Sequence, residues 1–271
     1  MDVSWELRES GPPEAEHTVL LLPGGMCSAG SYAEVMEQPV LAQARLVAAT
    51  LPGHAGASPP DDYSIENNAR LAAELATSVG ADVVAGFSMG ASVALEMVAS
   101  GSFTGPVVLL GVALSAPDEP AFFRAFVRLG GVLGTLPAAL LAKGAASMVK
   151  RVPASAERQA ELRDDLRKNV PGQVKQALDG YMRWLRQNER PAERLCEAGV
   201  PAWIVHAEKG DGGLTDDERR TLESCAHAHV VTIPGHVFLL PNEAPDRVAE
   251  IISEAISQSG QPRRAGSSSV S

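Results

Sequence analysis

The chain has few cysteines and no excess of positive charge, and each shortage excludes a kind of protein. Its three cysteines, Cys27, Cys196 and Cys225, are too few and too scattered for a disulfide framework or a zinc site. A reducing, cytoplasmic setting fits them best. The formal net charge of −10 argues against nucleic acid or an anionic membrane as the main partner.

The chain also lacks an apolar run that is expected to span a membrane. Residues 97–117 carry no charge, but the Ser-, Gly- and Pro-containing stretch 100–106 divides them into a helix end and a strand. The first six residues are acidic and lack the basic-then-apolar order of a signal peptide. Contact of the basic, apolar stretch 120–150 with a membrane surface is left open as an alternative. We expect no stable membrane association.

The order of apolar segments predicts an α/β fold, with a mostly parallel central sheet that helices cover on both faces. At 271 residues the chain can bury a substantial core. We expect strands at about residues 2–9, 18–22, 46–50, 82–85, 106–114, 202–206 and 230–233. Helices are expected at about residues 64–79, 91–99, 215–225 and 245–257, with Ser64 and Thr215 as the N-caps of two of them.

The strand pattern disappears between about residues 117 and 199, where helical segments interrupted by Gly and Pro replace it. We interpret residues 117–199 as a helical cap over the active edge of the sheet. The cap separates two parts of the core, at 1–116 and 200–257. Residues 258–271 are rich in Ser, Gly, Gln and Arg and are expected to form a disordered tail.

The sequence Gly86-Phe87-Ser88-Met89-Gly90 is the strongest indication of chemistry in the chain. It has the Gly-x-Ser-x-Gly form that places a nucleophilic serine on a sharp turn between a strand and a helix. The two glycines let strand and helix approach closely, so that Ser88 can take a strained conformation with its hydroxyl exposed. The alternative is a serine that only caps the N-terminus of the helix.

Two further candidate residues follow the ends of predicted strands. Asp211 follows the strand at 202–206, and His236 follows the strand at 230–233. Ligands of an open parallel sheet bind beyond the carboxyl ends of its strands, where residues remote in sequence meet. A serine hydroxyl needs an imidazole to take its proton, and the imidazole needs a carboxylate to fix its tautomer. The order Ser88, Asp211, His236 is typical of a serine on such a turn.

These motifs resemble those of the α/β-hydrolase superfamily, in particular of serine hydrolases with a helical cap. The resemblance covers about residues 18–257, except that the cap matches only in position and helical character. It implies that Ser88 is the nucleophile, His236 the base and Asp211 the acid, with an oxyanion hole formed by the backbone N–H groups of Gly25 and Met89. The matching stretches are residues 20–25 (Leu-Leu-Leu-Pro-Gly-Gly), 51–54 (Leu-Pro-Gly-His), 86–90, 206–211, and 235–236 with 238–245 after them.

The chain departs from the superfamily pattern at two places. Pro23 and Gly24 stand where many relatives have His-Gly, which leaves the N–H donors in place. The loop that holds Asp211 is one residue longer than the usual Gly-x-x-Asp. Glu208 and Asp118 therefore stay open as alternative acids.

Other residues near these motifs are assigned supporting roles. Met26, Phe122 and Phe126 are expected to line part of an apolar pocket, although packing must account for most apolar residues of the cap. The resemblance assigns the loop of His54 to shaping the site rather than to supplying the base. His206 lies inside an apolar strand, which predicts a buried core histidine.

A serine at position 88 favours acyl transfer to water, because relatives that dehalogenate or open epoxides use an aspartate there. We expect hydrolysis of a small, apolar carboxylic ester, thioester or lactone through an acyl-enzyme intermediate, with no metal or organic cofactor. Two other hypotheses remain. One is a cofactor-free haloperoxidase (perhydrolase) or a lyase on the same triad, and the other is a non-catalytic member that only binds a small molecule. The presence of all three triad residue types argues against the non-catalytic hypothesis.

Overall fold

A computed structural model gives the structure of the protein. It describes residues 4–119, 123–125, 127–129, 134–136, 140, 144, 149, 152, 154–209, 213–235 and 239–259. Within these ranges no helix has both the length and the apolar character needed to cross a membrane.

Seven strands form one sheet in the order β1-β3-β2-β4-β5-β6-β7. Only β1 and β3 pair antiparallel, and the other neighbours are parallel, which confirms the predicted α/β fold. Leu22 pairs with Gly86, so the segments that follow β2 and β4 start side by side. The strands are β1 (Glu6–Ser10), β2 (Thr18–Leu22), β3 (Arg45–Thr50), β4 (Val83–Phe87), β5 (Val107–Leu110), β6 (Ala202–Ala207) and β7 (Ala228–Ile233).

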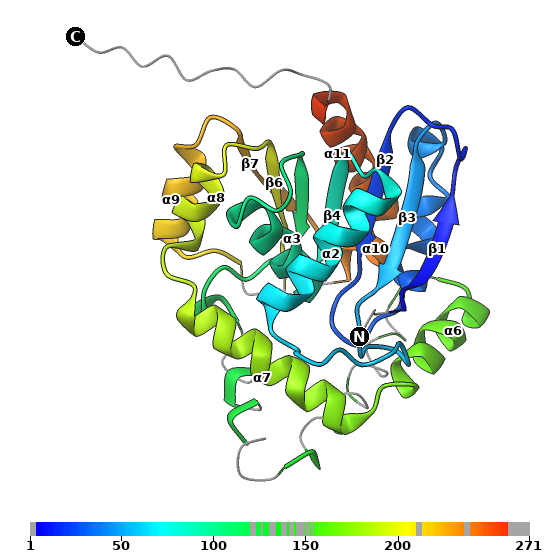
Figure 1. Cartoon of the computed structure of the whole chain (residues 1–271), viewed down its shortest axis with the longest axis vertical. Helices are drawn as coiled ribbons and strands as arrows, with labels where there is room; N and C mark the ends of the chain where they lie inside the picture. Colours follow the sequence, from blue (N-terminus) through cyan, green and yellow to red (C-terminus); the bar gives the residue numbers. More distant parts are fainter. Residues whose placement is uncertain are drawn as a thin grey trace.

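Helices cover both faces of this sheet (Figure 1). Alternate residues of each central strand enter two separate cores, as Leu20 and Leu21 of β2 show. This two-sided burial explains why the central strands read as continuous apolar runs. The helices of the first face are α2 (Ile65–Val79), α3 (Met89–Ala99), α8 (Pro191–Glu197) and α9 (Asp216–Glu223), and those of the second are α1 (Ala33–Met36), α10 (Leu240–Glu243) and α11 (Pro245–Ser259).

The two predicted N-caps are confirmed. The Ser64 side chain accepts a hydrogen bond from the N–H of Asn67 at the start of α2. Thr215 and Glu218 form a reciprocal capping box at the start of α9. Both caps satisfy backbone N–H groups that a helix leaves without partners at its N-terminus.

Two helices of the region predicted to be a cap, α6 (Ala156–Arg167) and α7 (Pro171–Gln187), lie beyond one end of the sheet (Figure 1). The buried carboxylate of Glu96 in α3 holds this region to the core. It accepts hydrogen bonds from Nε1 of Trp184 in α7 at 2.9 Å and from Arg194 in α8 at 3.0 and 3.1 Å. Helix α8 itself packs against α3 and α9 on the face of the sheet. The predicted domain boundaries stay a prediction.

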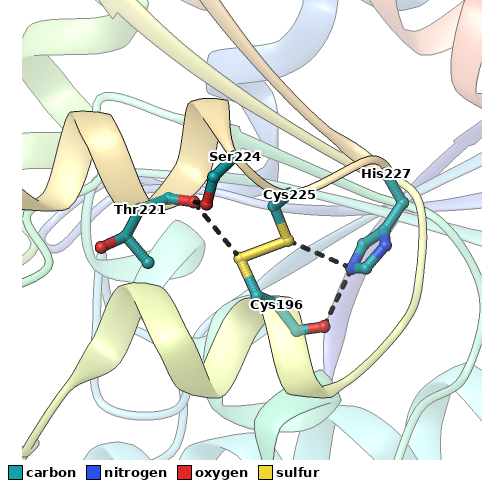
Figure 2. The surroundings of a disulfide bond; sticks show 5 residues. All are labelled: Cys196, Thr221, Ser224, Cys225 and His227. Carbon is teal, nitrogen blue, oxygen red and sulfur yellow. Dashed lines mark hydrogen bonds between the residues drawn. A yellow bond between two sulfur atoms is a disulfide. The ribbon is translucent and has the colours of Figure 1, made fainter. Parts of the chain in front are cut away.

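A disulfide joins Cys196, at the end of α8, to Cys225, just after α9, with 5.9 Å between the two Cα atoms (Figure 2). Nε2 of His227 lies 2.9 Å from the carbonyl oxygen of Cys196 and 3.5 Å from Sγ of Cys225. The sequence did not indicate this pairing, because it depends on the packing of α8 against α9. Disulfides are rare in reducing compartments, so this bond does not support the expected cytoplasmic setting.

Replacing both cysteines of this pair by serine should lower the free energy of unfolding by about 3–4 kcal/mol, because the bond closes a loop across 29 positions. Urea unfolding under oxidising conditions measures the loss. Dithiothreitol should destabilise the wild type by a similar amount and leave the double variant unaffected. A wild type that does not respond to the reductant would contradict the prediction.

Candidate active site

Ser88 lies between β4 and α3 in a backbone conformation that side chains rarely adopt, with φ 50° and ψ −116°. Its N–H donates to the carbonyl of Leu110 in the neighbouring strand at 2.8 Å. Its carbonyl accepts from the N–H groups of Ala91 and Ser92 at 2.9 and 3.1 Å. Strained residues of this kind cluster at functional sites, where the surrounding structure holds them in place.

The two glycines of the motif are required by close backbone contacts. A Cβ atom on Gly86 would lie 2.2 Å from the carbonyl oxygen of Gly90. A Cβ atom on Gly90 would lie 2.2 Å from the carbonyl oxygen of Leu22 and 2.6 Å from that of Pro23. Only glycine therefore lets α3 start so close to the ends of β2 and β4.

The side chain of Ser88 is not used to cap the helix. Ser88 occupies the N-cap position of α3, but its side chain makes no capping hydrogen bond. It is half-buried and lines a cavity instead. The interpretation of Ser88 as a mere N-cap serine therefore does not describe its geometry.

The two proposed oxyanion donors lie on segments that touch each other. Met89 is the first residue of α3, where the helix leaves N–H groups unpaired and its dipole favours negative charge. A Cβ atom on Gly25 would lie 3.2 Å from Cε of Met89, and one on Gly24 would lie 3.4 Å from Cβ of Ser88. A substrate carbonyl bound at Ser88 would thus be close to both donor segments.

A cavity of about 110 Å³ opens beside Ser88. Its wall is mostly apolar and includes Met26, whose role in binding a substrate stays a prediction. Helix α6 supplies Leu162 and Leu166 to this wall, and Asp165 of the same helix is the acidic residue among the described lining residues. The other lining residues that the structure describes are Gly24, Gly25, Cys27, Ser28, Ser31, Phe87, Val149, Leu239 and Asn242.

Asp211, His236, Phe122 and Phe126 lie outside the residues that the structure describes, so their assigned roles stay predictions. Gly235, directly before His236, and Leu239, three positions after it, are described. Leu239 lines the cavity together with Ser88. The N–H of Gly235 donates to Oε2 of Glu208 at 2.8 Å, which places this alternative acid against the backbone just before His236.

The other alternative acid, Asp118, is engaged within its own loop. Its Oδ2 accepts hydrogen bonds from the N–H groups of Leu114 and Ser115 at 2.9 and 2.8 Å. Burial, with the negative charge of Glu218 nearby, raises the pKa of Asp118 to about 6, although the backbone donors oppose this rise. Asp118 does not belong to the wall of the cavity beside Ser88.

The raised pKa of Asp118 predicts a pH-dependent stability. The folded protein binds this proton more tightly than the unfolded chain, so the carboxyl's contribution to stability should fall as pH rises from about 4 to 6. Asp118→Asn keeps an oxygen that accepts the two backbone N–H groups but does not titrate. Its stability relative to the wild type should therefore increase by about 1–3 kcal/mol between pH 4 and pH 7.

Urea unfolding at several pH values tests this prediction, with Asp164→Asn as the control. Asp164 has a side chain that is 64% exposed, so its replacement should show little such trend. A pH-independent difference between Asp118→Asn and the wild type would count against the prediction.

The side chains of His54 and His206 are buried, and Cys27 is a neutral thiol. His54 is buried, which lowers its pKa to about 4, so its imidazole is neutral near pH 7. His206 is buried within β6, as predicted for a core histidine. Burial, followed by the nearby charge of Asp165, raises the pKa of Cys27 to about 12, so Cys27 is a neutral thiol in the cavity wall.

Sequence reasoning missed the polar side chains that link α6 and the residue just beyond it to α1 and to the loop after β2. Asp165 accepts a hydrogen bond from the hydroxyl of Ser28. Arg158 pairs with Glu34 at 2.7 Å, and Asn169, just beyond α6, donates to the carbonyl of Met26 at 2.8 Å. No local pattern could have revealed these contacts, because the partners lie more than a hundred positions apart.

The strand order, the strained serine after β4 and the glycine-rich turn beside it define an α/β-hydrolase type of protein. The sequence matches the model of the alpha/beta hydrolase family over residues 19–251, and the chain belongs to this family. No curated protein matches the sequence.

Several solved structures share the fold over nearly their whole length. An esterase from Thermogutta terrifontis is 18% identical, with a TM-score of 0.75 and coverage of 96% of this chain and 95% of that one. The N-acyl homoserine lactonase AidH, in complex with N-butanoyl homoserine, is 18% identical, with a TM-score of 0.75 and coverage of 97% and 96%. A thioesterase domain from the curacin biosynthetic pathway is 19% identical, with a TM-score of 0.66 and coverage of 92% and 94%.

Proposed function

We propose that this protein is a serine hydrolase that cleaves a small carboxylic ester, thioester or lactone through an acyl-enzyme intermediate. Oγ of Ser88 attacks the carbonyl carbon while His236, held by Asp211, takes its proton. The N–H groups of Gly25 and Met89 stabilise the oxyanion. His236 then protonates the leaving group, and it activates the water that releases the acid.

The observation that carries this proposal is the conformation of Ser88. Its backbone is strained, its side chain does not cap the helix, and it lines a cavity next to the turn that holds Gly25. Backbone strain of this kind costs stability, and strained residues cluster at functional sites. The position of Leu239 in the same cavity supports the proposed role of His236, because Leu239 lies only three positions after it in the sequence.

The cavity supports a small and mostly apolar acyl group. Its volume of about 110 Å³ is below the roughly 300–1,000 Å³ of pockets that hold drug-sized ligands. The fold neighbours named as an esterase, a lactonase and a thioesterase support the choice of a carboxylic ester, thioester or lactone bond.

A fluorophosphonate probe tests the activation of Ser88, because only an activated serine reacts readily with it. We expect one label per chain, which peptide mapping places on Ser88 and which is absent from Ser88→Ala. A panel of short p-nitrophenyl esters, thioesters and lactones of graded acyl length then identifies the bond. We expect the rate to be highest for short acyl chains.

The same experiments separate the rival functions. A protein that binds these compounds without being labelled and without releasing acid would be a non-catalytic member. Labelling of Ser88 with a product other than the free acid and alcohol or thiol would indicate a perhydrolase or lyase instead.

A further inference from the structure

Residues 24–27 form a tight turn whose geometry decides where the Gly25 N–H points. The N–H of Cys27 donates to the carbonyl of Gly24 at 3.1 Å and closes the turn. In a trans peptide the C=O and N–H groups point in opposite directions. The carbonyl of Gly24 faces Cys27, so the N–H of Gly25 in the same peptide faces away from Cys27. Any twist of this turn would redirect that N–H.

Met26, the third residue of this turn, has a φ of 68°. Type II turns require a positive φ at this position and usually have glycine there. A residue with a side chain keeps such a conformation only where its surroundings hold it. The turn therefore depends on contacts from outside itself.

Two buried side chains supply these contacts, one on each side of Met26. The N–H of Met26 donates to Nδ1 of His54 at 3.0 Å, and its carbonyl accepts from Nδ2 of Asn169 at 2.8 Å. Asn169 is 9% exposed and follows α6. Its Oδ1 accepts from the N–H of Ala55 at 2.9 Å, so one amide group joins the end of α6 to both loops.

We propose that Asn169 is a positioning residue that, together with His54, holds the Met26 backbone so that the Gly25 N–H faces the oxyanion. This inference rests on the function proposed above. The effect acts through the Asn169 amide itself, which reaches the turn from just beyond the end of α6. His54 holds the other side from the core, whatever the position of α6.

The chemistry of the amide offers a sharp test. Aspartate at position 169 can still accept from the N–H of Ala55, but its ionised carboxylate cannot donate to the carbonyl of Met26 and would repel it. When the carboxyl is protonated, its O–H can donate in place of the amide. The loss of kcat in Asn169→Asp, relative to the wild type, should therefore be largest at high pH.

The measurement is kcat and KM for p-nitrophenyl acetate at pH 8 and pH 5.5, each relative to the wild type at the same pH. At pH 8 we expect Asn169→Asp to lower kcat about 10- to 100-fold, with KM changed by about threefold or less, because a small displacement of a catalytic donor weakens mainly the transition state. At pH 5.5 the deficit in kcat should be at least about three times smaller. Asn169→Ser removes the contact without adding a charge, so it should lower kcat at both pH values alike.

Arg158→Gln is the matched control. It removes the contacts of α6 with Glu34 and with the carbonyl of Gly30, but it does not touch Met26. If Asn169 only anchored α6, Arg158→Gln would lower kcat to the same extent. That result, or a deficit of Asn169→Asp that is equal at both pH values, would overturn the inference. If the wild type is active and labelled at Ser88, and both Asn169 variants have a normal kcat, the role of Asn169 is wrong but the proposed function stands. If the wild type is neither labelled nor active, the proposed function fails as well.

Discussion

Ser88→Ala should abolish ester hydrolysis, with a fall in turnover of about 10⁴- to 10⁶-fold by analogy with other serine triads. The reason is chemical, because alanine has no oxygen with which to form the acyl-enzyme. The fold should be unaffected, since the Ser88 side chain makes no capping bond to α3. Initial rates on the best ester of the panel measure the loss, and urea unfolding checks the fold. Equal rates for variant and wild type would defeat the proposed mechanism.

A second substitution at this position separates chemistry from strain. Ser88→Gly should be as inactive as Ser88→Ala but more stable than it by about 1 kcal/mol or more, because glycine adopts a φ of 50° without a steric penalty. Ser102→Ala, in the exposed loop after α3, is the control and should keep wild-type turnover. If Ser88→Gly and Ser88→Ala were equally stable, the backbone strain at Ser88 would be negligible.

Gly90→Ala should destabilise the protein by about 3 kcal/mol or more and remove activity from any fraction that folds. The added methyl group would lie 2.2 Å from the carbonyl oxygen of Leu22 and 2.6 Å from that of Pro23. Both contacts are to backbone, so no side chain can turn away to relieve them. Either α3 or the segment leading to Gly25 must shift. Circular dichroism during urea unfolding measures the loss.

Gly172→Ala is the matched control for this prediction. Gly172 lies in α7, and nothing lies within 4 Å of the position that its Cβ would take. Alanine has the higher helix propensity, so this variant should be as stable as the wild type or slightly more stable. Similar losses for Gly90→Ala and Gly172→Ala would show that the close contact at the start of α3 costs little.

The central strands were predictable from sequence because they are buried on both faces and read as unbroken apolar runs. The residues at which the strands end were harder to predict from sequence. The strand predicted for 106–114 ends at Leu110, because Gly111 has a φ of 58° and leaves the extended conformation. At the edge of the sheet, β7 is longer than predicted, since half-exposed residues such as Ala228 extend it without adding an apolar signal.

The candidate site divides in the same way between local and distant features. The turn at Ser88 is encoded by five consecutive residues, and the structure gives those residues the sharp turn that the motif predicts. The support of the neighbouring turn is not local, because Asn169 and Met26 are separated by 143 positions. Such a contact leaves no periodicity or motif in a single sequence. The pairing of Cys196 with Cys225 escaped prediction for the same reason.

The carboxylate of Asp165 in the cavity wall should affect the release of product from the proposed reaction. Hydrolysis converts a neutral ester into an acid that is ionised at neutral pH. Lys168 pairs with Asp165 at 2.7 Å, but with a side chain that is 57% exposed it screens the cavity only in part. The anionic product should therefore be repelled from the space that held its neutral precursor. If the proposed reaction takes place here, rapid departure of the acid and weak inhibition as it accumulates are the expected results of placing Asp165 in this wall.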